Sequence, residues 1–336
     1  MALGGRWLLV LCLVTGAASV QAREYRSHPG VLAFVTAVVE KHGFDRDELL
    51  ALFAQAQYQQ SIVDAMERPA ERVKPWYAYR AIFVTDKRIN GGVEFWRQNR
   101  ETLDRVQRDY GVDPAIVVAI IGVETSYGRI TGNYRVLDAL ATLAFDYPKR
   151  SEFFTRELEQ FLLLSREQRR DAMELRGSYA GAMGYGQFMP SSYRAYAIDY
   201  NGDGLTDIWN NPVDAIGSVA NYFVRHGWRA GGPVAAPAVA RNGYDASKVN
   251  VLVKPVLGPD ELASMGFKLA ATPAAGASAA DANAFPLELE GAGGAEFWLA
   301  YDNFYVITRY NHSHRYAMAV YQLSREIAAR MTDVPG

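Results

Sequence analysis

The sequence predicts an α+β protein that is predominantly α-helical. Helix signatures recur between Pro29 and His226, and a helical pattern returns from Tyr316 to Met331. From Gly232 to Thr308, proline, valine and lysine alternate with short apolar runs, a composition typical of strands. The chain has 336 residues, of which 49% are hydrophobic, so it can bury a large core divided between two or three packed units.

The first helices are expected close to the N-terminus. The stretch Pro29–Gly43 carries apolar residues at helical spacing and closes on a glycine. Asp45, with Glu48 three residues later, forms a capping-box pattern for a second helix. A long helix is expected over Asp86–Tyr110, and the pair Gly91-Gly92 is the position where it would break.

An aromatic stretch lies between these helices. Residues 74–80 hold Trp76, Tyr77 and Tyr79 on a turn that begins at Pro75. Aromatic side chains of this kind occur in hydrophobic cores and also in walls that stack on sugars. The pattern alone favours the core and leaves the sugar-stacking wall open.

The central helix is expected to begin at Asp113-Pro114. Aspartate accepts hydrogen bonds from the first amide groups of a helix, and proline at the first helical position gives up no bond. The largest apolar side chains of this helix lie seven, four and three residues before Glu124, at Val117, Ile120 and Ile121. Glu124 therefore shares their stripe and is expected to point toward the core.

Glu124 is a candidate general acid. Burial in an apolar setting raises the pKa of a carboxyl group, which then holds a proton that it can transfer near neutral pH. The alternatives are structural, because a glutamate at the end of a helix can bend out to water or pair with a buried arginine or lysine. The helix by itself leaves both interpretations open.

The remaining elements are read from periodicity and composition. Three further helices are expected at residues 136–145, 151–165 and 212–226. Strands of a smaller unit are expected at 249–253 and 297–308, and residues 270–284, rich in alanine, proline, glycine and serine, form a low-complexity loop.

The N-terminal residues predict export. Arg6 is followed by an apolar run over Trp7–Val14 and by small residues that end at Ala22. This pattern is typical of a signal peptide cleaved after Ala22, and the run is too short to span a bilayer. Cys12, the only cysteine, follows Leu11 instead of the small residue of a lipid-attachment site, so a soluble exported protein is favoured over a lipoprotein. After cleavage the chain has no thiol and no disulfide.

Charge and loop composition exclude several partners. The formal charge is −2, so no general affinity for nucleic acid or anionic lipid is expected. Residues 177–190 contain four glycines, which let the backbone approach a ligand, together with hydroxyl, aromatic and amide groups at Ser178, Tyr179, Tyr185 and Gln187. The stretch lacks the lysine of a P-loop and the spacing of a dinucleotide site, so we expect no nucleotide.

A second loop has the pattern of a calcium site. Oxygen-bearing side chains stand at its positions one, three, five and nine, at Asp199, Asn201, Asp203 and Asp207. With Gly204 at position six, this matches the front of an EF-hand loop. Asn210 replaces the glutamate of position twelve, and Asp214 is the nearest candidate for the missing ligand. The alternative is a turn rich in aspartate and asparagine that holds no ion.

Several stretches, taken in order, carry a resemblance. They are Gly122–Gly128, Gly177–Pro190, the calcium-like loop, Pro212–Phe223 and Thr308–Asn311. Together they resemble the lytic murein transglycosylase B family, and the likeness extends from about residue 29 to residue 330. Two positions depart from the family pattern, since Asn210-Asn211 is one residue longer and Lys149 stands where an arginine is expected.

The resemblance implies a lysozyme-like α core with an additional α domain and a small inserted β domain. The implied boundaries are a signal peptide at 1–22, an N-terminal α domain at 23–110, the core with its EF-hand-like loop at 111–228, the β domain at 229–305 and a C-terminal helix at 306–336 that returns to the core or the α domain.

The resemblance also implies an activity. Members cleave the β-1,4 bond between N-acetylmuramic acid and N-acetylglucosamine of peptidoglycan and leave a 1,6-anhydro sugar. A periplasmic enzyme is therefore expected, with peptidoglycan strands and other cell-wall enzymes as partners, a structural calcium ion and no catalytic cofactor.

Site residues carry over position by position. Glu124 matches the acid and base of the family. Positions that line the glycan groove fall on Tyr79, Lys149, Arg150, Ser178, Gln187, Phe188, Tyr222, Tyr310 and Tyr316. Calcium ligands fall on Asp199, Asn201, Asp203, Leu205 through its carbonyl group, and Asp214.

The chemistry depends on how many carboxylates face the substrate. A hydrolytic glycosidase uses two, and we find none beside Glu124 in its helix or in the glycine-rich loop, although distant acids such as Asp138 stay open. One carboxylate suffices if the substrate's own C6 hydroxyl attacks C1, with Ser178 orienting the N-acetyl group. The rival interpretations are a hydrolytic muramidase or chitinase-like enzyme and a non-catalytic peptidoglycan-binding protein.

Overall fold

The structure is a computed structural model that describes residues 25–68, 74–271 and 281–332. The expected signal peptide with Cys12 lies outside the described residues. The described residues form fourteen α-helices, two short 3₁₀ helices and six strands, which confirms the predicted class, α+β and predominantly α.

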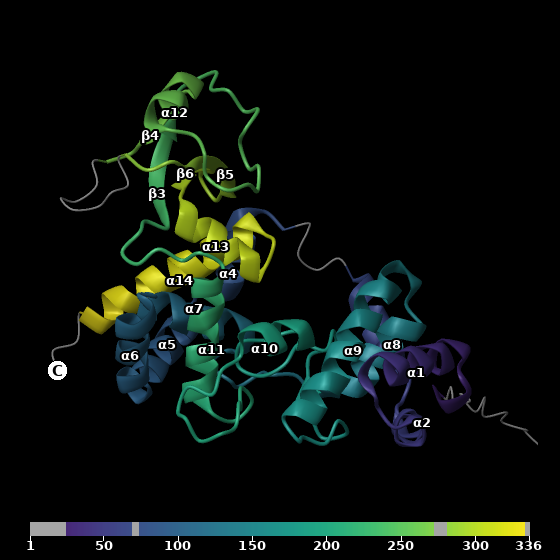
Figure 1. Cartoon of the computed structure of the whole chain (residues 1–336). Helices are drawn as coiled ribbons and strands as arrows, with labels where there is room; N and C mark the ends of the chain where they lie inside the picture. The colour runs from purple at the N-terminus through teal and green to yellow at the C-terminus, as the bar shows by residue number, and fades with distance from the viewer. Residues whose placement is uncertain (1–24, 69–73, 272–280, 333–336) are drawn as a thin grey trace, which may run out of the picture.

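One group of helices gathers around the N-terminal segment (Figure 1). Its core contains the rings of Phe34, Phe53 and Phe145, whose centroids lie 5.9 to 6.2 Å apart. The expected caps are present, since Gly43 ends the first helix with φ 64° and the Asp45 side chain accepts from the Glu48 amide at 2.8 Å. The group consists of η1 Tyr25–Ser27, α1 Pro29–His42, α2 Arg46–Gln55, α3 Gln60–Glu67, α8 Val136–Phe145, η2 Pro148–Arg150 and α9 Ser151–Glu167.

A second group of helices is built around α7, Pro114–Thr125. The last helix, α14, crosses α7, α5 and α4, while α11 packs against α6 and α7 (Figure 1). A short helix, α10 (Pro190–Tyr196), contacts both α9 and α11 and so connects the two groups. The other members are α4 Trp76–Phe83, α5 Asp86–Gln98, α6 Arg100–Tyr110, α11 Pro212–Arg225, α13 Asp302–Tyr310 and α14 His314–Thr332.

Two antiparallel sheets complete the fold. The larger sheet has the strand order β4-β3-β6-β5, and its β5–β6 hairpin turns between Gly291 and Gly294. Its strands and the helix beside them are β3 Ala235–Ala240, α12 Pro259–Met265, β4 Phe267–Leu269, β5 Phe285–Gly291 and β6 Gly294–Ala300. The smaller sheet pairs β1 (Tyr134–Arg135) with β2 (Arg176–Gly177).

Three predicted elements differ from the structure. The helix expected over Asp86–Tyr110 is two helices, and they meet at Asn99 while Gly91-Gly92 lies inside α5. The strand expected at 249–253 is not a strand, because Asn250 has φ 57° and its side-chain amide pairs with the backbone of Glu288 at 2.9 and 3.1 Å. In addition, the stretch expected as strand at 297–308 leaves the sheet at residue 300 and becomes α13.

Across residues 25–68, 74–271 and 281–332, no helix is both long enough and apolar enough to cross a membrane.

Candidate active site

Helix α7 brings Glu124 to the edge of the core. The Asp113 side chain accepts from the Ala115 amide at 2.8 Å, and Pro114 opens the helix as expected. Of its twelve residues eleven are buried, so the helix has no polar face and the expected apolar stripe extends all round it. Glu124 is the exception and is half-buried. Its side chain therefore lies where the core meets the surface.

The chain turns sharply directly after α7. Ser126 and Tyr127 have φ values of 50° and 66°, a left-handed conformation that costs free energy in residues other than glycine. The Thr125 hydroxyl fixes this turn, because it donates to the carbonyl oxygen of Tyr185 at 2.9 Å and accepts from the Gly128 amide at 3.0 Å. Strained backbone beside a half-buried carboxylic acid is a common feature of active sites.

Three glycines form a slot for the Tyr127 ring. A Cβ atom on Gly122 would lie 2.6 Å from the Tyr127 hydroxyl oxygen, one on Gly92 would lie 2.7 Å from it, and one on Gly91 would lie 2.9 Å from a ring carbon. Such distances are too short for real contacts, so only glycine fits at these positions. This explains Gly91-Gly92, which the sequence suggested as a helix break.

Arg88 joins the slot to the end of α7. Its guanidinium donates to the carbonyl oxygens of Gly122 and Val123, the two residues before Glu124, and its own carbonyl oxygen accepts from the Tyr127 hydroxyl at 2.7 Å. Burial lowers the pKa of Arg88. Arg88 was not predicted from the sequence. The nearby pair Gly91-Gly92 was the only unusual feature of the sequence around it.

Tyr316, in the first turn of α14, donates its hydroxyl hydrogen to Oε1 of Glu124 at 2.5 Å. Burial raises the pKa of Tyr316 well above its usual value, and the nearby Glu124 carboxylate raises it further. The phenol therefore stays protonated at any physiological pH and always presents a donor to the carboxylate.

An aromatic cluster adjoins this pair. The Tyr310 hydroxyl donates to the carbonyl oxygen of Gly186 at 2.6 Å, and burial followed by Glu124 raises its pKa well above the usual value. Phe188 lies 5.9 Å from Tyr222 and from Tyr310 between ring centroids. The Tyr222 hydroxyl donates to the Arg309 carbonyl oxygen at 2.6 Å. The glycine-rich loop, α11 and α13 thus meet beside Glu124.

Tyr79 approaches the same site from α4. It is buried, as is Trp76, whereas Tyr77 is 48% exposed, so the aromatic stretch contributes mainly to the core. Tyr79 is close enough to raise the pKa of Tyr316, after burial and Glu124. The Arg315 guanidinium lies 5.7 Å from the centre of its ring.

The glycine-rich loop is held by its own polar side chains. The Ser178 hydroxyl oxygen accepts from the amides of Ala180 and Ala182 at 3.2 and 3.1 Å. Gln187, with φ 51°, donates from its side-chain nitrogen to the carbonyl oxygens of Thr131 and Gly184 at 3.1 and 3.0 Å. Both predicted groove residues therefore shape the loop.

Lys149 and Arg150 lie in η2, within the group of helices around the N-terminal segment. Both are exposed. Lys149 forms an ion pair with Glu67 of α3 at 3.4 Å, and the Arg150 guanidinium lies 4.3 Å from the centre of the Phe153 ring in α9. These contacts are with α3 and α9 and not with Glu124, and a place in the glycan groove stays a prediction for both.

The calcium-like loop is closed by backbone hydrogen bonds. Asp199 accepts from the amides of Gly202 and Gly204, each at 2.7 Å. Asp203 accepts from the Leu205 amide at 2.9 Å and from the Asn201 side chain at 2.8 Å. This is the first part of the turn that an EF-hand forms around its ion.

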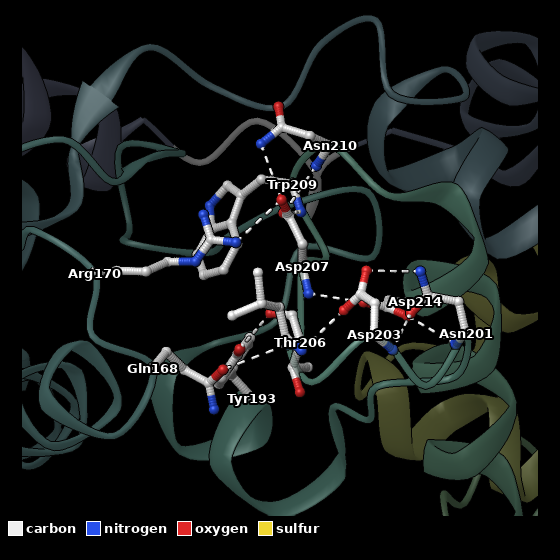
Figure 2. Close-up of polar contacts among 11 residues, drawn as sticks. Gln168, Arg170, Tyr193, Asn201, Asp203, Thr206, Asp207, Trp209, Asn210 and Asp214 are labelled. Atoms are coloured by element: carbon white, nitrogen blue, oxygen red, sulfur yellow. Dashed lines mark hydrogen bonds and ion pairs between the residues drawn. The ribbon is translucent and has the colours of Figure 1, made fainter.

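Asp207 is the last residue of this loop, and its amide donates to the carboxylate of Asp214, as Figure 2 shows. Asp214 is fully buried and accepts from the amides of Tyr200 and Asp207 at 2.9 and 2.8 Å. The Asp207 carboxylate, expected to face an ion at position nine, instead pairs with Arg170 at 3.0 Å and accepts from the Asn210 amide at 3.0 Å. These contacts lower the pKa of Asp207 against the opposing effect of burial, which is the largest influence.

The oxygen donors of this loop fit calcium by their chemistry. Their arrangement is less complete, because the described part of the chain brings no three histidine, cysteine, aspartate or glutamate side chains together around a point where an ion could sit. Asp199, Asn201 and Asp203, with the Leu205 carbonyl group and Asp214, are the residues that would hold the ion.

Comparison with known proteins shows which family the chain is similar to. Residues 27–325 match the family model described as Transglycosylase SLT domain. The chain is 45% identical over 314 residues to membrane-bound lytic murein transglycosylase B of Escherichia coli, a match that covers 91% of this chain and 84% of that protein.

Solved structures with the same fold include three lytic transglycosylases. Soluble lytic transglycosylase SltB1 of Pseudomonas aeruginosa is 50% identical, with a TM-score of 0.84 over 90% of this chain and 99% of that one. Slt35 of Escherichia coli, solved in complex with calcium, is 44% identical, with a TM-score of 0.82 over 91% and 95%. SltB3 of Pseudomonas aeruginosa, solved with NAG-anhNAM-pentapeptide, is 33% identical, with a TM-score of 0.78 over 88% and 78%. The predicted lysozyme-like fold is confirmed, and the chain belongs to the lytic murein transglycosylase family.

Proposed function

We propose that this transglycosylase cleaves the β-1,4 bond between N-acetylmuramic acid and N-acetylglucosamine in peptidoglycan and releases a 1,6-anhydromuramoyl product. Glu124 acts as the acid and then as the base. The observation that carries the proposal is the Glu124–Tyr316 hydrogen bond at the end of α7, which holds one carboxylic group at the edge of an apolar core. The relative SltB3 was solved with an anhydro sugar ligand, which supports the same product here.

The reaction needs no second carboxylate. Glu124 transfers its proton to the glycosidic oxygen while the bond between that oxygen and C1 breaks. The resulting carboxylate then accepts the proton of the C6 hydroxyl as O6 bonds to C1, so Glu124 ends protonated and no water is consumed. The Glu124 carboxylate lies close enough to Tyr310 to raise the pKa of its phenol, after burial, which is the largest influence.

Other groups would bind the sugars. Phe188, Tyr222, Tyr310, Tyr316 and Tyr79 form the aromatic side of the proposed groove, Ser178 and Gln187 its polar loop, and Lys149 and Arg150 a cationic end. The proposed peptidoglycan substrate implies a periplasmic enzyme. A calcium ion in the loop from Asp199 to Asp207 would have a structural role, as the calcium complex of the relative Slt35 supports.

The test is product analysis with Glu124→Gln. Glutamine keeps the size of the side chain and the hydrogen bond from Tyr316 but cannot transfer a proton, so turnover should fall by roughly 10²–10⁴-fold while sacculus binding persists. Mass spectrometry of the released fragments identifies the reaction, because a 1,6-anhydro product is lighter by one water than the product of hydrolysis.

The matched control is Glu101→Gln, an exposed glutamate of α6, which should keep full activity. Near-normal turnover by Glu124→Gln would falsify the role of Glu124. Products that carry a reducing end would instead assign a hydrolytic muramidase, and the absence of released fragments from wild type would favour a binding protein.

A further inference from the structure

Arg88 is a half-buried arginine in the first turn of α5, the helix that packs against α7 (Figure 1). Its pKa is lowered by burial, raised by Tyr127 and lowered by Arg129, and no carboxylate of the described residues is among these influences. A buried arginine usually has a carboxylate partner, because taking its charge out of water costs free energy. Other groups must therefore balance the charge of Arg88.

The carbonyl groups at the end of α7 provide this balance. The last four carbonyl groups of a helix have no partner within the helix, and they give that end a partial negative charge. One nitrogen of Arg88, Nη1, donates to the carbonyl oxygens of Gly122 and Val123, the second at 3.3 Å. The Gly122 carbonyl oxygen also accepts from the Ser126 amide at 3.1 Å. Arg88 is therefore the cation at the C-terminal end of the helix that carries Glu124.

The backbone of Arg88 is fixed as well. Its amide donates to the Thr85 hydroxyl oxygen at 3.3 Å, and its carbonyl oxygen accepts from the Tyr127 hydroxyl at 2.7 Å. Tyr127 follows Glu124 by three residues, so Arg88 contacts the chain on both sides of Glu124. A rotation or shift of the last turn of α7 would break at least one of these bonds.

Glu124 is consequently held at two points. Tyr316 of α14 donates to its carboxyl oxygen at 2.5 Å, and Arg88 of α5 holds the backbone that precedes it. The rate of a reaction is sensitive to such positions, since a displacement of about 1 Å can cost roughly 10²-fold. The hydrogen bond from Tyr316 alone leaves the backbone under Glu124 free to shift.

We propose that Arg88 is a positioning residue, whose guanidinium fixes the last turn of α7 and so directs the carboxyl group of Glu124 at the glycosidic oxygen. This rests on the proposed function, because Arg88 acts here through the same proton transfer. Since its effect passes through the backbone of α7, removing the guanidinium should slow the reaction and leave the affinity for the glycan unchanged.

Two variants of Arg88 test this role. Arg88→Met should lower kcat for the release of soluble fragments about tenfold and leave KM within a factor of about two. Arg88→Lys should recover kcat to within about threefold of wild type, because both hydrogen bonds come from a single nitrogen that an ammonium group can replace.

The matched control is Arg105→Met on α6. The Arg105 guanidinium is also half-buried, donates to the Tyr200 carbonyl oxygen at 2.6 Å and lies 3.8 Å from the centre of the Tyr200 ring. This variant loses the same kind of contact away from Glu124, so its kcat should stay within about twofold of wild type. Equal losses of kcat in Arg88→Met and Arg105→Met, or no recovery in Arg88→Lys, would overturn the positioning role.

A double-mutant cycle separates positioning from stability. If Arg88 acts through Glu124, Arg88→Met should not lower the residual turnover of Glu124→Gln any further. The same fold-loss in both backgrounds would mean that Arg88 only stabilises the fold. If Arg88→Met does not fold, Arg88→Gln replaces it in the cycle. Near-normal turnover by Glu124→Gln would overturn the proposed function itself, an outcome distinct from the failure of Arg88 alone.

Discussion

The hydroxyl group of Tyr316 lies 2.5 Å from Oε1 of Glu124 and joins the last helix of the chain to the end of α7. The two residues are 192 positions apart. Since the pKa of the phenol is raised well above its usual value, by burial first and by Glu124 second, the contact is a hydrogen bond to one specific carboxylate oxygen at every working pH.

Tyr316→Phe should lower kcat about tenfold and leave KM within a factor of two or so, because it removes a donor that fixes the reacting carboxyl group. The measurement is steady-state release of soluble fragments. Tyr321→Phe is the matched control, because that tyrosine lies on the same helix and donates to the Ala235 carbonyl oxygen at 2.8 Å, away from Glu124. Equal losses of kcat in both variants would mean that Tyr316 acts only through stability.

Gly122→Ala should destabilise the protein, although alanine normally favours a helix by about 1 kcal/mol over glycine. The added Cβ would lie 2.6 Å from the Tyr127 hydroxyl oxygen, and such overpacking costs about 1–3 kcal/mol. Chemical denaturation measures the change. Gly293→Ala, where a Cβ meets nothing within 4 Å, controls for the substitution itself.

The cause is tested by a double-mutant cycle. In a Tyr127→Ala background the ring is gone, so Gly122→Ala should become neutral or stabilising. If Gly122→Ala still destabilises there by the same amount, the clash with Tyr127 is not the reason that glycine occupies this position.

Local signals in the sequence were sufficient to predict most of the helices. The predicted range 136–145 matches α8 residue for residue, and Asp113-Pro114 opens α7. These signals are caps and periodicity, which depend on neighbours in the chain. The helices α3, α4, α10 and α12 were missed, because each has only seven or eight residues and too few turns to show a period.

The errors have a common physical origin. Gly91-Gly92 does not break α5, because it makes room for the ring of Tyr127, which follows more than thirty residues later. Asn250 leaves the expected strand to pair with Glu288 on the edge of β5. Both features depend on residues distant in the chain, which local periodicity does not report.

The candidate site also combines residues that local motifs predict with residues that only the tertiary packing brings there. The motif around Glu124 predicted the acid of the proposed reaction, and resemblance to the family predicted Tyr310 and Tyr316 as groove residues. Arg88, which holds the carbonyl groups just before Glu124, belongs to no motif, and only the packing of α5 on α7 brings it there.

Calcium should stabilise the loop from Asp199 to Asp207. At a calcium concentration 100 times the dissociation constant, the free energy of unfolding should rise by about 2.7 kcal/mol, seen as a higher Tm that EDTA reverses. Asp203→Asn keeps a side-chain acceptor for the Leu205 amide but removes a charge, so the calcium-dependent shift should shrink or vanish. Asp171→Asn, an exposed residue outside the loop, should retain the full shift. A wild-type Tm that calcium does not change would exclude the ion.

Acid should destabilise the fold through His314, the first residue of α14. Burial lowers the pKa of His314 from 6.5 to about 4, and its Nε2 atom has no hydrogen-bond partner within the described part of the chain. The unfolded chain binds a proton near pH 6.5 and the folded one only near pH 4. The stability is therefore complete above pH 6.5 and falls as the pH drops toward 4, by up to about 3 kcal/mol.

The variant His314→Gln isolates this effect. Glutamine does not titrate, so denaturation curves between pH 7 and pH 4 should show a smaller loss of stability than in wild type. His226 and His312 also have lowered pKa values, chiefly from burial, and contribute equally to both proteins. The difference between the two pH profiles therefore belongs to His314, and parallel profiles would show that its protonation is not coupled to folding.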